Sequence, residues 1–564
     1  MTTEPLTRTA LTPPGTISVS GEVRERLDRS MEHLMRLDAH PLRSEFVEPD
    51  AAWHWGADYM GRWIGTVARL AQITGNGHQV AAVARELIGY QNEDGSFGSY
   101  GEDHDFQEWF GMGRGLVGLL DYYSVSDDDF ALQSARRLGD YYVENYPEVV
   151  GTQVECYATA LDGLVRLAGL TNDDRYLQTA RRVADTSTPM QRVWASMTFG
   201  YRGLRTPVAG AVHCHLLAAR GLLDLFEVTR EDKYLEGVHA LYEQLESEAL
   251  SVNGAVGEFL MGAEESETCS DADWLRLNLQ LWRVTGQPAY MDMAEHVLVN
   301  ALYFDQAETG AFCYRRGVQG RPGATFDACC SSHGPRAMVE AVSYAFAGDP
   351  ERLSVNLFLD ATGSVAVGGG AVRVEMVTWQ DTEARVRGVR LTVDPGEGRS
   401  FPLQVRVPAW AGRALVLVNG EQIAHSAAGP TVTVQRHWSA GDLVEVTCPL
   451  AVRIVRGQTL GRHVTDDRAV AVFCGPRLFS LTERLNPETR LDMLRLALPT
   501  SDAAQVVRIV GPDRLEAPGV GPDAKPVTLA LWPLASTGGS PNGIGRTHPT
   551  KASYFKVWIP VTEA

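Results

Sequence analysis

A repeated two-helix pattern fills the first 350 residues and constrains the fold more than any other feature of the sequence. Five copies each join an amphipathic helix, a short polar turn, an anchor residue and a second helix. Apolar residues recur at i, i+3, i+4 and i+7, and Gly, Asn, Asp or Pro stands where one helix must stop and the next begin. The equivalent anchors lie 46 to 58 residues apart, at Gln79, Phe130, Tyr176, Tyr234 and Tyr290. Periods of this length indicate helical hairpins rather than a strict solenoid.

A sixth, partial unit at 337–347 predicts that the hairpins close into an (α/α)6 toroid, or barrel, with long loops and a concave site at one mouth. After Pro350 the pattern changes to alternating strands between Gly, Asp-Pro-Gly and Asn-Gly turns, which is typical of antiparallel β-sandwiches. We therefore predict a multidomain α + β protein. Its expected parts are an N-terminal segment (1–20) with a short strand at 16–20 that joins a β-domain, the (α/α)6 barrel (21–350), a β-sandwich (351–455) and a second, smaller β-domain (456–564).

The charge of the chain argues against two classes of partner. The sequence has 51 Lys+Arg and 70 Asp+Glu, a formal charge of −19 that is spread along the chain, whereas nucleic acids and anionic membranes require clustered Lys and Arg. The N-terminal segment lacks the apolar core of a secretion signal, and no stretch approaches the roughly 18 apolar residues of a membrane span. We expect a cytoplasmic monomer or homodimer without a nucleic-acid or membrane partner.

Eight cysteines in 564 residues are too few for a disulfide scaffold. The adjacent pair Cys329-Cys330 could bridge only through a strained ring, so in a reducing compartment these thiols are better suited to a metal. Glu267 and Cys269 stand two residues apart at the start of another helix, where an extended turn points both to one side. The four side chains make an O,S,S,S set, which suits tetrahedral Zn²⁺. A plainer interpretation makes Cys269 and Cys330 buried apolar residues and Glu267 a carboxylate favoured by the helix dipole.

The order of these motifs resembles the β-L-arabinofuranosidase family of glycoside hydrolases. The resemblance is carried by ETC, then QLWRVTGQPAYMDMAEHVLVNALY, GAFCY, and ACC followed by HGPR, and further by YMGRWIGTVARLAQITGN, LQVRVPAWAG and SYFKVWIP. It extends over most of the chain from about residue 50 onward, and the chain is similar to a divergent member. The resemblance implies a retaining glycosidase in which Glu267, Cys269, Cys329 and Cys330 bind zinc and Cys329 is the nucleophile. A zinc-bound thiol is already a thiolate at neutral pH, and sulfur would then replace one carboxylate of the usual retaining pair.

The sequence offers three candidates for the general acid and base, because the loop before ETC is shorter than in the family. The role needs a carboxylate of raised pKa, for which Glu258, Glu264 and Glu265 are all candidates, and we favour Glu264 because it directly follows the Gly262-Ala263 step. The alternative is that this acidic cluster is a solvated helix start stabilised by the dipole.

The resemblance also implies a sugar pocket with altered side chains. Arg62 and Arg114 replace family histidines, which suggests an anionic substituent on the substrate, since Arg binds carboxylates and phosphates bidentately. The alternative is that both arginines pair with local carboxylates such as Asp105 or Glu108. We assign further substrate contacts to His213, Tyr314 and Trp55; Trp53 and Trp55 form either a stacking platform or ordinary packing.

Two functions follow as hypotheses. The first is a zinc-dependent, cysteine-nucleophile hydrolase of a small-molecule glycoside or oligosaccharide, a β-L-arabinofuranoside or a related glycoside that could be anionic. The second is a non-hydrolytic tailoring reaction or carbohydrate binding on the same fold, with a structural zinc.

Overall fold

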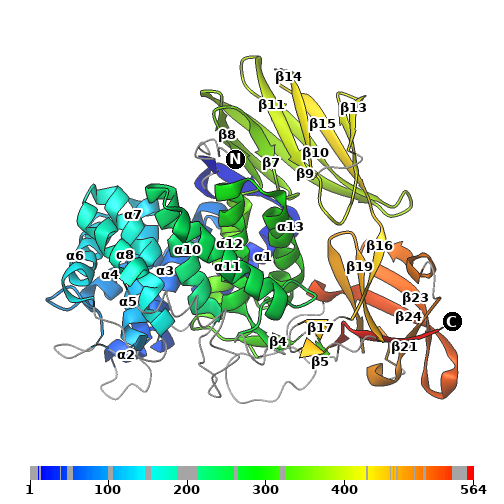
Figure 1. Ribbon diagram of the computed structural model, residues 1–564, viewed down its shortest axis with the longest axis horizontal. Coiled ribbons are helices and arrows are strands. Elements are labelled where there is room, and N and C mark those ends of the chain that lie inside the picture. Colours follow the sequence, from blue (N-terminus) through cyan, green and yellow to red (C-terminus); the bar gives the residue numbers. More distant parts are fainter. Residues whose placement is uncertain are drawn as a thin grey trace.

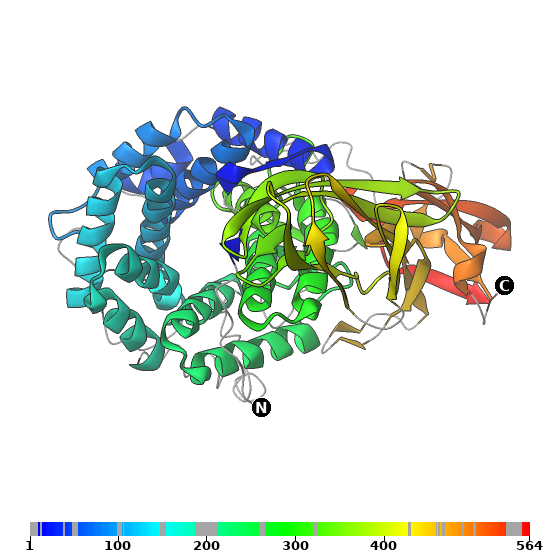
Figure 2. The same cartoon turned by 90° about the horizontal axis from the view of Figure 1, so that it is seen from above.

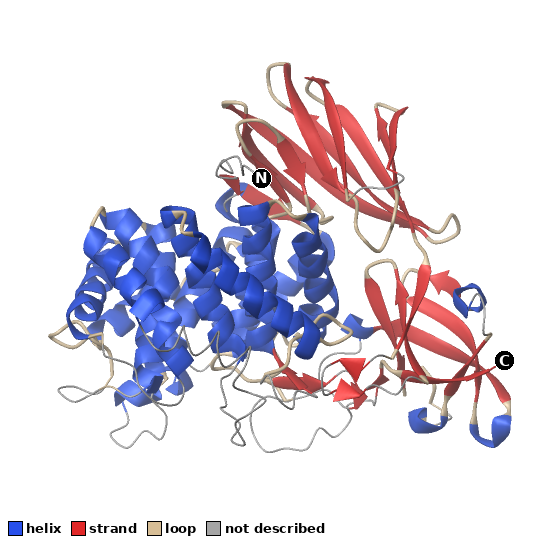
Figure 3. Ribbon diagram, in the orientation of Figure 1, coloured by secondary structure: helices blue, strands red, loops and turns tan. Residues whose placement is uncertain are grey.

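The computed structural model describes most of the chain. The described residues are 10–11, 14–37, 40–47, 55–98, 104, 106–146, 154–186, 212–258, 265–317, 319–320, 324–426, 430–457, 459–460, 463–464, 468–483, 485–487, 490–499, 503–536 and 555–563. Helices fill the N-terminal part and strands fill the rest (Figure 3). Within these residues, no helix combines the length and apolar character that a membrane crossing requires.

The N-terminal part is helical, as the hairpin pattern predicts. Its helices are α1 (Gly21–Arg36), α2 (His40–Val47), α3 (Gly56–Thr74), α4 (Val80–Gly89), α5 (Phe106–Ser126), α6 (Asp129–Asn145), α7 (Leu161–Thr171), α8 (Asp174–Thr186), α10 (Val212–Thr229), α11 (Asp232–Glu248), α12 (Thr268–Thr285), α13 (Pro288–Val297), α14 (Tyr303–Asp305) and α15 (Cys330–Ser343), with short helical turns at η1 (Pro14–Thr16), η2 (Val154–Ala160) and η4 (Leu298–Leu302).

The helices form two concentric rings, so the (α/α)6 toroid is confirmed (Figure 2). The inner ring runs α3, α5, α7, α10, α12 and α15, and α15 contacts α3 to close it. Helix α1 packs on both α3 and α15 and completes the sixth hairpin from the opposite end of the domain. The sixth unit is therefore assembled from the two ends of the domain rather than from consecutive residues.

The inner helices pack so closely that glycine is required at one crossing. A Cβ atom on Gly118 of α5 would lie 2.2 Å from the carbonyl oxygen of Gly61 on α3, so the two backbones touch. Helix α5 is buried on all sides from Glu108 to Tyr122. A helix buried all round belongs in the interior, and here that interior is the wall of the toroid.

Two sheets follow the toroid and form a sandwich (Figure 1). One has the order β1-β6-β7-β11-β14 and the other β13-β12-β15-β10-β9-β8-β2. Strand β8 alternates buried and more exposed residues along its length, as expected where one face of a strand packs inward. The strands are β1 (Ala10–Leu11), β2 (Ile17–Val19), β6 (Phe346–Gly348), β7 (Leu353–Val355), β8 (Ala361–Val367), β9 (Gly370–Asp381), β10 (Val386–Asp394), β11 (Arg399–Arg406), β12 (Ala414–Val418), β13 (Glu421–Ser426), β14 (Thr431–Trp438) and β15 (Asp442–Pro449).

The N-terminal segment belongs to this sandwich. Strand β2 pairs antiparallel with β8, and Ser18 faces Thr362 across the pair. Strand β1 pairs with β6. The chain thus contributes to the sandwich before it enters the toroid, while the domain limits given above stay a prediction.

A third sheet forms the C-terminal unit. Its order is β16-β19-β26-β21-β23-β24-β20-β25-β5, and β22 pairs with β23. Strand β5 comes from a loop of the toroid and pairs with β25, so this unit is attached beside the loops that precede α15. The remaining strands are β3 (Glu265–Glu267), β4 (Arg315–Gly317), β5 (Gln319–Gly320), β16 (Val452–Arg456), β17 (Thr459–Leu460), β18 (His463–Val464), β19 (Ala469–Cys474), β20 (Arg477–Thr482), β21 (Arg495–Leu498), β22 (Arg508–Gly511), β23 (Arg514–Val520), β24 (Pro526–Pro533), β25 (Phe555–Lys556) and β26 (Ile559–Glu563).

Candidate active site

Two neighbouring inner helices bring the four predicted metal ligands together. Glu267 ends β3 in an extended conformation and Cys269 lies in the first turn of α12, while Cys329 caps α15 and Cys330 begins it. One ligand atom from each of the four side chains lies within 4.8 Å of the others. The Sγ atoms of Cys329 and Cys330 are 3.6 Å apart, and those of Cys269 and Cys330 are 3.7 Å apart.

The chain before each helix is held by hydrogen bonds, which fixes the ligands. The Thr268 hydroxyl donates to the carbonyl of Cys313 (2.6 Å), and β3 pairs with β4. Asp327 accepts from the Ser331 hydroxyl (2.9 Å) and lies 2.7 Å from Nε2 of His33 on α1. Both ligand pairs therefore stand at helix N-termini, where the helix dipole favours negative charge.

The electrostatics of the cluster favour one thiolate and call for a cation. Hydrogen bonds from the thiols of Cys269 and Cys330 hold the pKa of the Cys329 thiol well below its usual range. Burial, the Cys329 thiolate and Glu258 raise the pKa of Glu267. Burial and the Cys329 thiolate also raise the pKa of the Cys269 and Cys330 thiols, because further negative charges beside that thiolate would repel it; a divalent ion would offset that repulsion and let all four groups ionise. Three sulfur donors and one oxygen donor fit zinc in number and type.

A hydrogen-bonded ring lies directly beside the cluster. Arg62, on α3, donates from Nη2 to Nε2 of His213 (2.8 Å) and from Nη1 to Nδ1 of His333 (3.2 Å). Its Nη1 is also 3.8 Å from Sγ of Cys269, and its Nε donates to Asp58. Most of the N–H groups of Arg62 are therefore directed at protein acceptors.

Asp273 completes this ring from the opposite side. Its Oδ2 lies 2.7 Å from Nδ1 of His213 and 3.0 Å from Nε2 of His333. Burial lowers the pKa of both histidines, which are therefore neutral, and Arg62 offers only donors. Each ring must then turn its lone pair to Arg62 and its N–H to Asp273. His213, Asp273 and His333 are also close enough to hold a metal, but binding through the nitrogens that face Asp273 would turn the other N–H of each ring toward Arg62, which has no acceptor.

The second predicted arginine has partners of its own. Arg114 Nη2 donates to Asp162 (2.6 Å) and to the carbonyl of Thr159, and its Nη1 lies 3.4 Å from the same carboxylate. Both arginines thus pair with carboxylates, but with Asp58 and Asp162 rather than with the two suggested from the sequence. Glu108 lies beside His104, and Asp105 is outside the described residues. That either arginine binds substrate stays a prediction.

The three acid and base candidates have different surroundings. Glu258 is buried, and its Oε1 accepts from the hydroxyl of Tyr314 (3.0 Å). It also lies close enough to Glu267 to raise the pKa of that group. Glu265, the first residue of β3, is exposed. Glu264, the candidate favoured from the sequence, lies outside the described residues.

The remaining predicted contacts lie around the same mouth of the toroid. Trp55 packs edge-on against Phe110 (5.3 Å between ring centroids) and Phe106 (6.2 Å). Phe110 in turn lies 5.8 Å from the ring of His213. Trp55 is therefore next to the site, although its assigned stacking role stays a prediction; Trp53 is outside the described residues.

Two residues of the site were missed by the sequence reasoning. Asp273 follows Cys269 by four residues, and His333 follows Cys330 by three. Positions three or four apart lie on one face of a helix, so Asp273 and His333 each lie one helical turn after a predicted ligand and on the same face. This spacing was the available signal.

Models of two protein domains match most of the chain. The profile of the β-L-arabinofuranosidase GH127 catalytic domain matches residues 25–340, and that of the GH127 middle domain matches 352–450. Among curated protein sequences, none matches the chain.

Three solved structures are similar over their full length. A GH127 β-arabinofuranosidase has a TM-score of 0.79 at 17% identity, with 99% of each chain covered. A GH127 β-L-arabinofuranosidase from Geobacillus stearothermophilus T6 has a TM-score of 0.77 at 17% identity, covering 97% of this chain and 100% of that one. A glycoside hydrolase has a TM-score of 0.75 at 17% identity, covering 99% and 98%. At this identity the likeness establishes a shared fold.

Proposed function

The chain belongs to the GH127 β-L-arabinofuranosidase family and is a glycosidase, and from this premise we propose that it cleaves β-linked L-arabinofuranosides with Cys329 as the nucleophile. The observation that carries the proposal is the cluster of Glu267, Cys269, Cys329 and Cys330 at two helix N-termini. Of these four side chains, only that of Cys329 is partly exposed. A nucleophile has to reach its substrate, whereas a purely structural ligand does not.

We propose that the same four residues hold a zinc ion. When bound, the ion would supply positive charge that keeps the thiols deprotonated at neutral pH. Even without the ion the surroundings favour a thiolate at Cys329, because the thiols of Cys269 and Cys330 donate to it, and the guanidinium of Arg62 lies 3.8 Å from Sγ of Cys269. A reducing compartment such as the cytoplasm would keep these thiols unoxidised.

The reaction would proceed in two steps. The Cys329 sulfur attacks the anomeric carbon, the bond from that carbon to the leaving oxygen breaks, and the oxygen takes a proton from a carboxylic acid. Water then attacks the same carbon and gives its proton to the carboxylate, the carbon–sulfur bond breaks, and the Cys329 thiolate is restored. The configuration of the anomeric carbon is retained.

We propose Glu258 as the acid and base. It is buried beside Glu267, and the Tyr314 hydroxyl donates to its Oε1, so this carboxyl group is held in a fixed orientation next to the cluster. Glu265 lacks this burial. Glu264 stays the alternative that the sequence favours.

The hydrogen bonds of the arginines favour a neutral sugar over an anionic one. Bidentate recognition of an anion needs two parallel N–H groups. Arg62 already directs Nε and Nη1 at Asp58, His333 and Cys269, and its Nη2 at His213. Arg114 is similarly engaged with Asp162. We therefore propose that both arginines shape the pocket rather than bind a charged substituent.

The test is intact-protein mass spectrometry with an aryl β-L-arabinofuranoside, together with zinc quantification. We expect about one zinc per chain, a transient mass increase of one pentosyl unit in Glu258→Gln, and none in Cys329→Ala. The matched control is Cys448→Ala, which removes a buried thiol from the β-sandwich and should leave turnover unchanged. Turnover by Cys329→Ala would rule out the nucleophile, and unimpaired turnover by Glu258→Gln would return the acid and base role to Glu264 or Glu265.

A further inference from the structure

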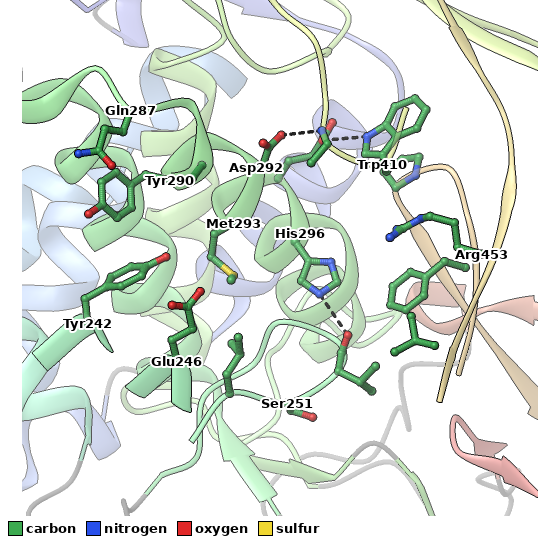
Figure 4. A pocket seen from close by; sticks show the side chains of 18 of the residues that line it. Tyr242, Glu246, Ser251, Gln287, Tyr290, Asp292, Met293, His296, Trp410 and Arg453 are labelled. Atoms are coloured by element: carbon green, nitrogen blue, oxygen red, sulfur yellow. Dashed lines mark hydrogen bonds between the residues drawn. The ribbon is translucent and has the colours of Figure 1, made fainter. Parts of the chain in front are cut away.

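A second cavity, separate from the thiol cluster, lies where the toroid meets both β-units (Figure 4). Its volume is about 750 Å³, and it is lined by residues of α11, α13, β16 and β19 and by Trp410 and Trp558. This size falls within the roughly 300–1,000 Å³ typical of small-molecule sites. We propose that this interdomain cleft binds a neutral oligosaccharide.

Part of the cleft is held rigid by bonds between the domains. The backbone N–H of Ala409 donates to Asp292 (3.1 Å), and Nε1 of Trp410 donates to Oε2 of Glu295 (3.0 Å). On the opposite side, Nε2 of His296 donates to the carbonyl of Val252 (3.1 Å). These contacts join α13 to the sandwich and to the loop after α11, so these walls of the cleft are fixed in position before a ligand binds.

Other polar groups of the cleft are left open. Glu243 and Glu246 stand on α11, and Arg453 and Arg456 on β16. All four are exposed, and within the described part of the chain none of them forms an ion pair or a side-chain hydrogen bond. Figure 4 shows Glu246 and Arg453 on opposite sides of the cleft. Arg453 is positioned by Phe473, whose ring lies 5.0 Å below its guanidinium.

This charge pattern selects the class of ligand. Glu243 and Glu246 would repel an anion, and Arg453 and Arg456 would repel a cation. A hydroxyl group both donates and accepts, so a neutral polyol can donate to the carboxylates and accept from the guanidiniums at once. Such bonds to charged groups are the stronger kind.

Aromatic rings supply the apolar half of the recognition. Tyr242, Tyr290, Phe473, Trp410 and Trp558 all border the cleft, and the two tryptophans are partly exposed. Flat aromatic surface with a polar edge suits a ligand that is apolar on its ring faces and polar at its rim. A sugar chain has this character, whereas a purely apolar ligand would leave the four charged groups unsatisfied.

The cleft is a different site from the proposed catalytic one. The thiol cluster stands at the N-termini of the inner helices α12 and α15, whereas the cleft lies on the outer helices α11 and α13 and shares no residue with that cluster. The proposal therefore stands independently of the catalytic assignment.

The test is calorimetric titration of the full chain with linear neutral arabino-oligosaccharides of increasing length. Saturating L-arabinose is present to occupy the catalytic pocket. Ala289→Trp fills the cleft from an exposed position on α13, while Arg453→Gln and Glu246→Gln each remove one open charge. We expect Ala289→Trp to abolish binding and the other two to weaken it about tenfold, as for a lost charge-assisted hydrogen bond. Turnover of an aryl glycoside should be unchanged in all three.

The matched control is Arg175→Gln, which removes an exposed arginine from the toroid surface and should leave binding unchanged. Absence of binding to the wild type, or equal binding by all three cleft variants, would overturn the proposal. Equal or tighter binding of an acidic uronate oligosaccharide would overturn the neutral assignment. If the wild type did not cleave aryl glycosides, that result would count against the catalytic proposal and would not affect the proposal that the cleft binds an oligosaccharide.

Discussion

Replacing Asp273 with asparagine should destabilise the toroid strongly, because no arrangement of the amide satisfies its neighbours. The carboxylate is fully buried and accepts on both oxygens. Oδ2 faces His213 and His333, and Oδ1 faces Arg220 (3.3 Å) and Arg276 (3.0 Å). An amide turned either way points its NH₂ group at two donors. If the histidines took their other tautomer, their N–H groups would face the N–H groups of Arg62, which cannot accept a hydrogen bond.

The size of the effect follows from what is left buried. Arg220 and Arg276 are 6% and 2% exposed, so both lose a charge partner with little access to water. Removing one partner from a buried ionic network costs about 3–5 kcal/mol, and each donor left unsatisfied costs about 1–3 kcal/mol. Glu340 still neutralises part of the arginine charge, since it accepts from Nε of Arg276 (2.7 Å). We therefore expect a loss of about 3–5 kcal/mol of unfolding free energy rather than the full sum.

Denaturant unfolding followed by tryptophan fluorescence measures this loss, and Trp274 is a buried reporter next to the substitution. Asp173→Asn is the matched control, because Asp173 pairs with the exposed Arg175 at the surface. The double variant Arg62→Gln/Asp273→Asn should lose less than the sum of the two single variants, since a glutamine carbonyl can accept from the alternative histidine tautomer, while Arg62→Gln alone also leaves Asp58 without its buried partner. An Asp273→Asn midpoint equal to that of the wild type would refute the hydrogen-bond directions assigned to this network.

Three further predictions test other parts of the molecule. Gly118→Ala should lower the free energy of unfolding by about 1–3 kcal/mol, because the new methyl group forces α3 and α5 apart. The control is Gly89→Ala, whose methyl group would have nothing within 4 Å and should not destabilise the chain in the same assay. Burial raises the pKa of Asp224 to about 7, so its contribution to stability is complete below the unfolded pKa of 3.8 and is lost as the pH rises through about 7. Asp224→Asn should therefore flatten the fall of melting temperature between about pH 4 and 7, and an unchanged slope would exclude this carboxyl as its source. Removal of the proposed zinc by a chelator should lower the melting temperature of the wild type. Cys269→Ser or Cys330→Ser should lower both the zinc content and the melting temperature. A melting temperature that does not change with the chelator would contradict a structural contribution from the ion.

The hairpins and their closure into a ring could be predicted from the sequence, because the repeats follow local spacing and can be counted, whereas the segment that completes the sixth hairpin could not. Helix α1 is tied to the far end of the domain by contacts such as Arg26 Nη1 to the carbonyl of Tyr303 (2.9 Å), across 277 residues. Strand β2 meets β8 in the same way. No local pattern records which distant segment an amphipathic helix or a short strand will meet.

The site shows the same division between local and distant information. Asp58 stands four residues before Arg62, so that ion pair was readable from helix spacing. Asp162 is 48 residues from Arg114 and becomes its partner only because α5 and α7 are neighbours in the ring. The proximity of Glu258 to Glu267 likewise depends on tertiary contacts, since the backbone N–H of Glu258 bonds to the carbonyl of Glu265 (3.3 Å).

The network around Asp273 also explains why an arginine can occupy position 62, where the family resemblance leads one to expect histidine. A neutral histidine there would have a single donor for two neighbouring imidazoles, and the tautomers of His213 and His333 would not both be fixed. Arg62 donates to both rings, His213 donates to Asp273, Nε2 of His333 lies 3.0 Å from the same carboxylate oxygen, and Arg220 and Arg276 donate to the other oxygen of Asp273. Every bond therefore runs from a donor to an acceptor, with the charge of Arg62 balanced by Asp58. The exchange of histidine for arginine is thus compatible with the fold because the chain supplies both an acidic partner and two lone pairs, and it does not require a charged substrate.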